Sequence, residues 1–586
     1  MRKFIQWWEK ESGFPREKRY ITLLKSFVLA LLPLVCVMVY CVSRGRSPGE
    51  VYLPVSEWND ELFYFKQVEG IVHYGYPQGY FGFNESHAMK LSFAAWSPVL
   101  VFPWILWGLL FGWNLLSPIA CNIFLLSLCC FLFVWLVKPA WKQLGILTLL
   151  FCLYTPFVRY MLSGMPEVIC FTMLILFYAL AIHYQRGKKS GELVLLFLLS
   201  GVMTLMRPYM LLFLLLPVWL LIDRQRKKGK LWRGAAGAAA VLVFVLGLYA
   251  CIKHYLGAEY FTPLFYMDWI SSYFEQGLFG GMRYTASRLY RMGTEFLRHT
   301  RAGFENGLAS GAFFACHLVC GGILAGWSYR DWRVLRRRKA DAVMKADGAG
   351  KENKPETGAS GTEKETAEGA GSGGSRIGAW VTTGERALFA VEVHMALSFI
   401  AMLFALLLMY KLTEGSKHLL TFIAAAVFVV PLMDTKFYKK AVLLGVTFAY
   451  FLSYRAVDPY DYQVPFIQEQ RSRELETWRG VLDGEMMLNL VDTPNYDNVV
   501  IWVFADQEEG KYQNIPWQLL YAVPEGFGIS CCMDGYVKEN FDTLKSRYLA
   551  SIPEGHIAAL CREAGYQEVY RDETLVLYDR QAQESE

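Results

Sequence analysis

The chain has 586 residues, of which 54% are hydrophobic and only 19% are charged. This hydrophobic fraction is well above that of an ordinary soluble protein, and many uncharged stretches reach the ~20 residues that cross a bilayer. The composition therefore excludes a soluble globular protein and indicates a polytopic membrane protein. Because the net charge is only +5, the placement of the charges is more informative than their sum. Nucleic acid is not expected as a partner.

Basic clusters between the hydrophobic stretches predict the orientation of the chain, because cytoplasmic loops are enriched in Lys and Arg. They place six segments on the cytoplasmic side, namely 1–19, 138–142, 186–189, 223–233, 329–339 and 436–440. About eleven transmembrane helices are expected between them, near 20–41, 115–137, 143–158, 166–184, 192–205, 209–222, 234–254, 306–327, 386–410, 419–433 and 440–454. The N-terminus is then cytoplasmic, the first span is an uncleaved anchor, and the C-terminus is outside.

One further apolar segment, 95–113, does not fit this alternation. If it crossed the membrane, every later basic loop would lie on the wrong side. Pro98 and Pro103 also interrupt it. We therefore expect a juxtamembrane or re-entrant helix in the outer leaflet.

The regions outside the spans suggest a modular organisation. A transmembrane module at 20–454 contains outer loops at 42–113 and 255–305. A cytoplasmic insert at 340–376 is nearly free of large apolar residues and is expected to be disordered. The tail at 455–586 is expected to form a small extracytoplasmic α/β domain. Its strands are predicted at Val499 to Phe504 and Phe527 to Cys531, its helices at Trp517 to Tyr521 and His556 to Cys561, and a closing hairpin at Gln567 to Tyr570 and Thr574 to Tyr578.

Of the 13 cysteines, ten lie in or beside predicted spans, where a thiol behaves as a small apolar residue. Cys531, Cys532 and Cys561 fall in the outer tail. Neighbouring cysteines rarely bridge each other, so a bond from Cys561 to either of the other two is an open possibility. No spacing indicates a structural zinc site.

Asp60 and Glu61 are the first candidates for chemistry, in the outer loop that follows the first span. Two interpretations stay open at this point. They are solvated or helix-capping acids, or a carboxylate in a partly dry cleft that takes a proton from a hydroxyl or holds a divalent cation.

Three other candidate sites are expected at the outer ends of later spans. Glu167 begins a span directly after a proline, and Arg159 ends the preceding one; a helix-terminal acid is the simpler interpretation of Glu167, a polar cavity the other. Arg207 splits a hydrophobic stretch too long for one crossing. Either it extends to the headgroups, or it is a fixed cation for an anionic lipid. Lys417 and His418, in a late outer loop, are either interfacial anchors or phosphate ligands.

The order of these signals resembles that of the GT-C superfamily of integral-membrane glycosyltransferases, and most of all its branch of protein mannosyltransferases and aminoarabinose transferases. Asp60, with Glu61 beside it, matches the acid of the first outer loop, and Trp96-Ser97-Pro98 resembles the start of the juxtamembrane helix. Glu167 matches the acid of the second outer loop, and Arg207-Pro208 matches a recurring Arg-Pro. The similarity covers 20–250 well and 380–455 loosely.

The resemblance implies a mainly α, GT-C-like transmembrane bundle that transfers a sugar from a polyprenyl-phosphate donor to a glycan, lipid or protein acceptor at the outer face. Asp60 would be the general base of an inverting displacement, with Glu61 and Glu167 either orienting the acceptor or binding a cation. No cofactor is certain; a divalent metal, Mg or Mn, is an open possibility, with Asp60 and Glu167 as its ligands. The donor phosphate would bind Arg207, Lys417, His418 and Arg159. Membrane lipid and acceptor contacts are expected from Trp58, Tyr64, Asn84, Glu85 and His87.

Two other classes of protein fit a polytopic chain with acids and cations. A transporter or flippase of lipid-linked sugars would carry internal repeats and ionisable groups near the bilayer midplane. Here no repeat is evident and the candidates cluster at the outer face, which favours the enzyme. The other class is a non-catalytic protein of cell-envelope polymer assembly, whose tail domain would bind wall glycans.

Overall fold

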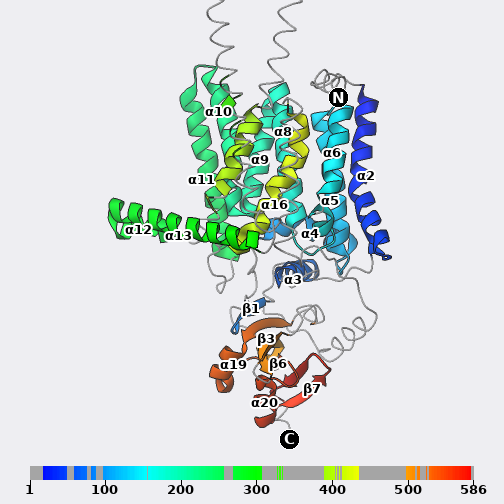
Figure 1. The fold of residues 1–586 in the computed structure, drawn as a ribbon, viewed down its shortest axis with the longest axis vertical. Helices are drawn as coiled ribbons and strands as arrows, with labels where there is room; N and C mark the ends of the chain where they lie inside the picture. The colour runs from blue at the N-terminus through cyan, green and yellow to red at the C-terminus, as the bar shows by residue number, and fades with distance from the viewer. Residues whose placement is uncertain are drawn as a thin grey trace, which may run out of the picture.

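The structure is a computed structural model with a helical bundle at one end and a small mixed sheet at the other (Figure 1). It describes residues 18–48, 59–75, 81–87, 97–154, 156–256, 268–305, 389–402, 412–433, 496–508, 511–514 and 527–581, with a few single positions between them. This part of the chain is mainly helical, as the composition predicts.

Five helices are long and apolar enough to cross a membrane. They are α2 (Arg19–Ser43), α5 (Ser117–Val137), α8 (Glu167–Gly187), the continuous pair η2 (Pro208–Leu214) and α10 (Leu215–Arg226), and α11 (Leu231–Leu256). Shorter apolar helices are α4 (Pro98–Phe111), α6 (Trp141–Leu153), α9 (Ser190–Met206), Phe389–Met402 and Leu420–Leu432, the last formed by parts of α16 (Leu412–Val429) and η3 (Val430–Leu432). Of the other expected spans, 306–327 lies mostly and 440–454 wholly outside the described residues.

The predicted span 143–158 is two pieces in the structure. Helix α6 ends at Leu153, and α7 (Pro156–Met161) begins three residues later. Proline lacks a backbone N–H and restricts the residue before it, so Pro156 suits the first position of a new helix rather than the middle of an old one. The continuous apolar run conceals this break.

Burial varies strongly around the bundle. In the most apolar window of α8, 83% of residues are buried, whereas in α11 only 6% are. Helix α8 therefore lies at the centre of the bundle and α11 at its edge, with large apolar side chains such as Val243 and Phe244 exposed. Outward-facing apolar side chains on long helices are those of an integral membrane protein.

The sheet has the strand order β2-β1-β5-β3-β6-β8-β7, with β4 also paired to β3. Its C-terminal strands are β3 (Val499–Glu508), β4 (Lys511–Asn514), β5 (Gly528–Met533), β6 (Tyr548–Ser551), β7 (Gln567–Arg571) and β8 (Val576–Asp579). Helices α19 (Asp534–Asn540) and α20 (His556–Glu563) join them. The two predicted strands, the helix at His556 and the closing hairpin are confirmed, while Trp517 to Tyr521 lies outside the described residues.

Two strands of this sheet come from the first loop after α2. Strand β1 (Phe81–Phe83) pairs in parallel with β5, and β2 (Ser86–His87) turns back against β1. The Glu85 carboxylate in the turn between them accepts hydrogen bonds from the backbone N–H of Lys545, at 2.9 Å, and from the N–H and hydroxyl of Ser546, at 2.7 and 2.6 Å. The early loop is thus an integral part of the late sheet, which the sequence does not predict.

Helix α3 (Asn59–Tyr74) lies between the bundle and the sheet (Figure 1). Lys66, which is buried, donates to Glu69 and to the backbone carbonyl of Val523, both at 2.8 Å. The Trp113 indole donates to the carbonyl of Phe65 at 3.2 Å. Helix α3 is therefore fixed by both parts of the molecule.

The three cysteines of the tail are buried and free. Cys532 donates to the carbonyl of Ser530, two residues earlier on β5. The bridge from Cys561 that the sequence leaves open is not formed in the structure.

Candidate functional site

The candidate site is built around the break between α9 and η2. Arg207 follows the last residue of α9 in an extended conformation, with φ −145° and ψ 122°. The next residue is Pro208, which disfavours the helical conformation for the residue before it. The sequence Arg-Pro therefore ends α9 at this point, and the Arg207 side chain is completely buried.

The guanidinium of Arg207 connects three segments. Its Nη2 donates to Glu167 Oε1 at 2.9 Å, and its Nη1 donates to His418 Nδ1 at 2.8 Å and to the Tyr209 hydroxyl at 3.2 Å. We call Glu167, Arg207, Tyr209 and His418 the buried cluster. It brings together α8, the α9–η2 break and α16, which are distant in the sequence.

The contact with Arg207 determines the tautomer of His418. A guanidinium has only donors, so His418 Nδ1 must accept. The ring is then neutral with its proton on Nε2. His418 therefore presents a hydrogen-bond donor on the side of the ring away from Arg207.

Glu167 is the first residue of α8 and follows Pro166. A carboxylate is stabilised at a helix N-terminus, and this one is fully buried. Oε1 accepts from Arg207, while Oε2 has no hydrogen-bond partner among the residues that the structure describes. Glu167 Oε2 can therefore accept a further hydrogen bond inside the cluster.

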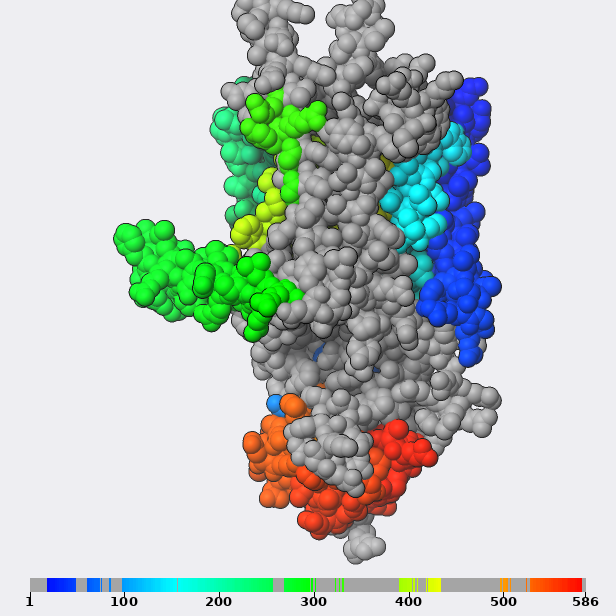
Figure 2. Space-filling model, viewed as in Figure 1, coloured from blue at the N-terminus to red at the C-terminus, as the bar shows by residue number. Residues whose placement is uncertain are grey.

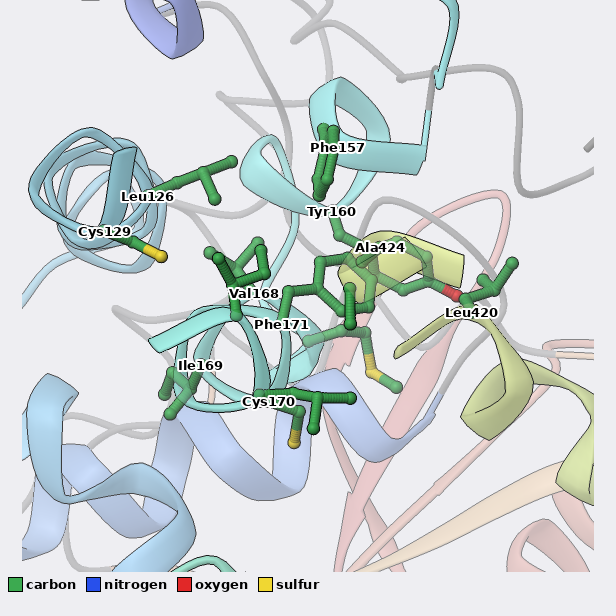
Figure 3. Close-up of a cluster of buried hydrophobic side chains, with 14 of the residues drawn as sticks. Leu126, Cys129, Phe157, Tyr160, Val168, Ile169, Cys170, Phe171, Leu420 and Ala424 are labelled. Carbon is green, nitrogen blue, oxygen red and sulfur yellow. The ribbon is translucent and has the colours of Figure 1, made fainter. Parts of the chain in front are cut away.

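Apolar side chains surround the first turns of α8. Figure 3 shows Phe157, Tyr160, Val168, Phe171 and Leu420 packed from α7, α8 and α16. The Tyr154 hydroxyl also donates to the carbonyl of Leu420 at 3.0 Å, which fixes α16 against the α6–α7 break. Electrostatic interactions are strong in such a low-dielectric setting.

The acidic helix of the first loop lies near this cluster. Glu61 of α3 is fully buried, and Tyr64, one turn later, interacts electrostatically with Arg207. Asp60 is the second residue of α3. The backbone of Asp60 is therefore about one helical turn from Tyr64, the residue of α3 that interacts with Arg207. Trp58 and the side chains of Asp60 and Lys417 lie outside the described residues.

The other residues singled out from the sequence fall elsewhere. Arg159 is buried in α7, which leads into Glu167. Asn84, Glu85 and His87 lie in the β1–β2 hairpin at the sheet, where Tyr536 donates to the carbonyl of Asn84. The structure thus brings Glu61, Glu167, Arg207 and His418 to one end of the bundle and takes Glu85 into the sheet.

Tyr209 is the member of the cluster to which the sequence assigns no role. Its hydroxyl lies 3.2 Å from Arg207 and 3.4 Å from His418. The available signal was its position two residues after the arginine, inside the same break.

The cluster suits an anion better than a divalent cation, because a guanidinium lies 2.9 Å from the Glu167 carboxylate. Within the described part of the chain, no group of three or more His, Cys, Asp or Glu side chains is arranged to hold a metal ion. The Asp60 side chain lies outside the described residues, so a metal ion held by Asp60 and Glu167 stays a prediction.

No protein-family model and no curated protein matches the chain. Solved structures of the oligosaccharyltransferase of Archaeoglobus fulgidus are similar to it at 12% identity. The form tethered to an acceptor peptide with an NVT sequon gives a TM-score of 0.46 over 92% of this chain and 70% of that one. AglB from the same organism, in complex with an inhibitory peptide and a dolichol-phosphate, gives 0.44 over 98% and 75%. Identity this low carries no information about activity.

Proposed function

We propose that this protein is a membrane glycosyltransferase that moves a sugar from a polyprenyl-phosphate donor to an acceptor at the outer face of the membrane. The observation that carries the proposal is the buried Arg207, held by Glu167 and His418 beside the helix that begins with Asn59-Asp60-Glu61. A fixed cation near acids suits sugar transfer from a lipid phosphate, because the cation stabilises the leaving phosphate and an acid can take the acceptor's proton. The sequence resemblance to GT-C enzymes supports the same assignment.

Arg207 is the proposed ligand of the donor phosphate. As the sugar leaves, negative charge develops on the phosphate, and a preorganised cation in a dry site stabilises that charge most effectively. Glu167 and His418 hold the guanidinium in place before the donor arrives. The Nε2–H of His418 and the Tyr209 hydroxyl supply further donors, while Lys417 and Arg159 add positive charge on neighbouring segments.

Asp60 is the proposed general base. A carboxylate within reach of the acceptor hydroxyl takes its proton as the oxygen attacks the anomeric carbon, and the phosphate departs from the opposite face, which inverts the configuration. Glu61, buried on the same helix, orients the acceptor. Tyr64, one turn after Glu61 on the same helix, contacts the sugar.

The proposed orientation follows the positive-inside rule. Figure 1 shows the start of α2 at the end of the bundle opposite the sheet, and the basic segment after α10 is predicted to share its side of the membrane. The sheet, α3 and the buried cluster would then face the outside. In this arrangement the lipid-linked donor enters from the outer leaflet and the C-terminal domain is extracytoplasmic.

Mass spectrometry of envelope glycans and lipid-linked sugars in cells tests this function. We compare wild type with Asp60→Asn and, as a matched control, Asp542→Asn at an exposed position of the tail. The transferase predicts loss of one sugar and accumulation of its polyprenyl-phosphate donor in Asp60→Asn only. Unchanged glycans and donor at normal protein levels would refute the catalytic role of Asp60.

Donor binding by the purified protein separates the enzyme from a transporter or an assembly protein. Asp60→Asn should retain binding of the polyprenyl-phosphate sugar, and Arg207→Gln should lose it. A wild-type protein that binds the donor but never forms product with any envelope acceptor would contradict the enzyme.

A further inference from the structure

A second region with unassigned chemistry is the helix pair α12 (Asp268–Glu275) and α13 (Gly277–Glu305). Figure 1 shows the pair running across the direction of the spans, near the sheet-facing end of α11, and Figure 2 shows it standing out from the side of the molecule. Gly277, with φ +72°, makes the sharp turn between them.

The pair is a defined unit. The Thr285 hydroxyl donates to the Tyr273 hydroxyl at 3.3 Å, and Arg288 lies 3.5 Å from Asp268. Gly281 is buried under the Tyr273 ring, where a Cβ atom would collide with it. These contacts use one side of α13 and leave its apolar side uncovered.

The uncovered side is a long apolar stripe. It contains large side chains that are 53% to 85% exposed and recur at helical spacing, namely Leu278, Phe279, Met282, Tyr290 and Leu297. Phe274 of α12 is 86% exposed as well. In water, such a surface would be costly.

The rest of α13 is strongly basic. The helix contains five arginines and two glutamates. At helical spacing, Arg283 and Arg301 border the apolar stripe, whereas Arg291 and Arg298 fall on the far side. Apolar and aromatic side chains on one face with arginines on the other are typical of a helix that lies in a membrane interface.

We infer that α12–α13 lies on the surface of the phospholipid bilayer, with the apolar stripe in the acyl boundary and Arg283 and Arg301 at headgroup phosphates. The position of the transmembrane helices indicates that lipid covers the apolar stripe. They fix the bilayer around the bundle, and a helix that runs across them where α11 ends lies along its surface. Lipid is therefore the partner present wherever the bundle is embedded, and it matches both the apolar stripe and the basic border.

Photo-crosslinking of the full chain in phosphatidylcholine nanodiscs tests the inference. The benzophenone amino acid p-benzoylphenylalanine is introduced in place of Met282 or Leu278 on the stripe, and in place of Arg291 on the opposite side. Phe244, exposed on α11, is the positive control for lipid contact. Adducts are identified by mass spectrometry.

We expect lipid adducts at 278 and 282 at a yield comparable with 244, and at least fivefold lower yield at 291. Absence of lipid adducts at both stripe positions, with a normal yield at 244, would overturn the inference. Adducts from 278 and 282 to a second copy of the chain would overturn it too, because the stripe would then be a protein interface. Neither result bears on the transferase activity, which is tested separately at Asp60.

Discussion

Arg207 and Glu167 form a salt bridge of 2.9 Å, in which neither side chain is more than 1% exposed. Two charges are expensive to bury, and removal of either one leaves the other without compensation, at a cost of about 3 to 5 kcal/mol. The pair therefore adds little net stability, but it holds the Arg207 guanidinium in one position.

Replacement of Arg207 by lysine should impair donor use although the charge is kept. The guanidinium reaches Glu167 from one nitrogen and His418 from another, and a single ammonium cannot reproduce this fork. The loss of one charge-assisted hydrogen bond, worth about 1.5 to 3 kcal/mol, predicts a roughly 10- to 100-fold lower kcat/KM for the lipid donor. Steady-state kinetics measure it, with Arg562→Lys at an exposed position of α20 as the control. Equal kinetics in both variants would argue against a phosphate role for Arg207.

A double-mutant cycle between Glu167→Gln and Arg207→Gln should reveal strong coupling. Glu167→Gln leaves the buried charge of Arg207 without its partner, and Arg207→Gln does the same to Glu167. Each single change should therefore destabilise the bundle by about 3 kcal/mol or more. The double change removes both charges and should cost less than the sum of the two singles. Thermal unfolding in detergent measures the coupling, and additive effects would mean that the pair is not formed in solution.

His418 should be replaceable by an acceptor but not by an apolar residue. Its Nδ1 accepts from Arg207 at 2.8 Å, so His418→Gln keeps an acceptor, whereas His418→Leu leaves the guanidinium unsatisfied. We expect His418→Leu to lose about ten times more activity than His418→Gln. If the two variants were equally impaired, the Nε2 donor rather than the Nδ1 acceptor would be the important atom.

Loss of Glu85 should release the β1–β2 hairpin from the sheet. Its carboxylate accepts from two backbone N–H groups and one hydroxyl, and the two donors of Ser546 stay half-buried without it. Glu85→Ala should therefore lower stability by about 2 to 3 kcal/mol, with faster hydrogen exchange at 81–87. Glu573→Ala, at an exposed position, is the control. Unchanged exchange at 81–87 would show that β1–β5 pairing alone holds the hairpin.

The thiols of the tail should stay unreactive in the folded protein. Burial raises the pKa of Cys532 to about 11 and that of Cys561 to about 12, from an ordinary 9.0. A raised thiol pKa favours the protonated form, so this contribution to stability is complete below pH 9 and is lost as the pH rises through 11 to 12. Iodoacetamide at pH 8 should modify both residues only after denaturation. A disulfide-linked peptide containing Cys561 would contradict the structure.

The helical class and several elements of the tail could be predicted because their signals are local. Long apolar runs give α2, α5 and α11, and β-branched residues bounded by polar ones give β3. Glu167, Arg207 and His418 of the buried cluster were also identifiable, since ionisable side chains at the ends of apolar helices are costly unless they meet partners.

Contacts between residues that are far apart in the sequence could not be predicted. No local signal shows that Arg207 pairs with Glu167 rather than with a lipid, or that Phe81–Phe83 joins a strand at Gly528–Met533. Strand β1 has only three residues, Phe81–Phe83, and so short a strand gives no recognisable pattern within a loop-like sequence. The break at Pro156 was hidden for another reason, because the apolar run continues through it.

The hairpin at β1 has a consequence for biogenesis. The hydrogen bond from Glu85 to Ser530 joins residues 445 positions apart, and a ribosome adds about 5 to 20 residues per second. The strand that completes the sheet is therefore synthesised roughly 20 to 90 seconds after the loop that carries Asp60. Every chain that stops before β5 leaves that loop without its sheet, so maturation of the candidate site is coupled to completion of synthesis.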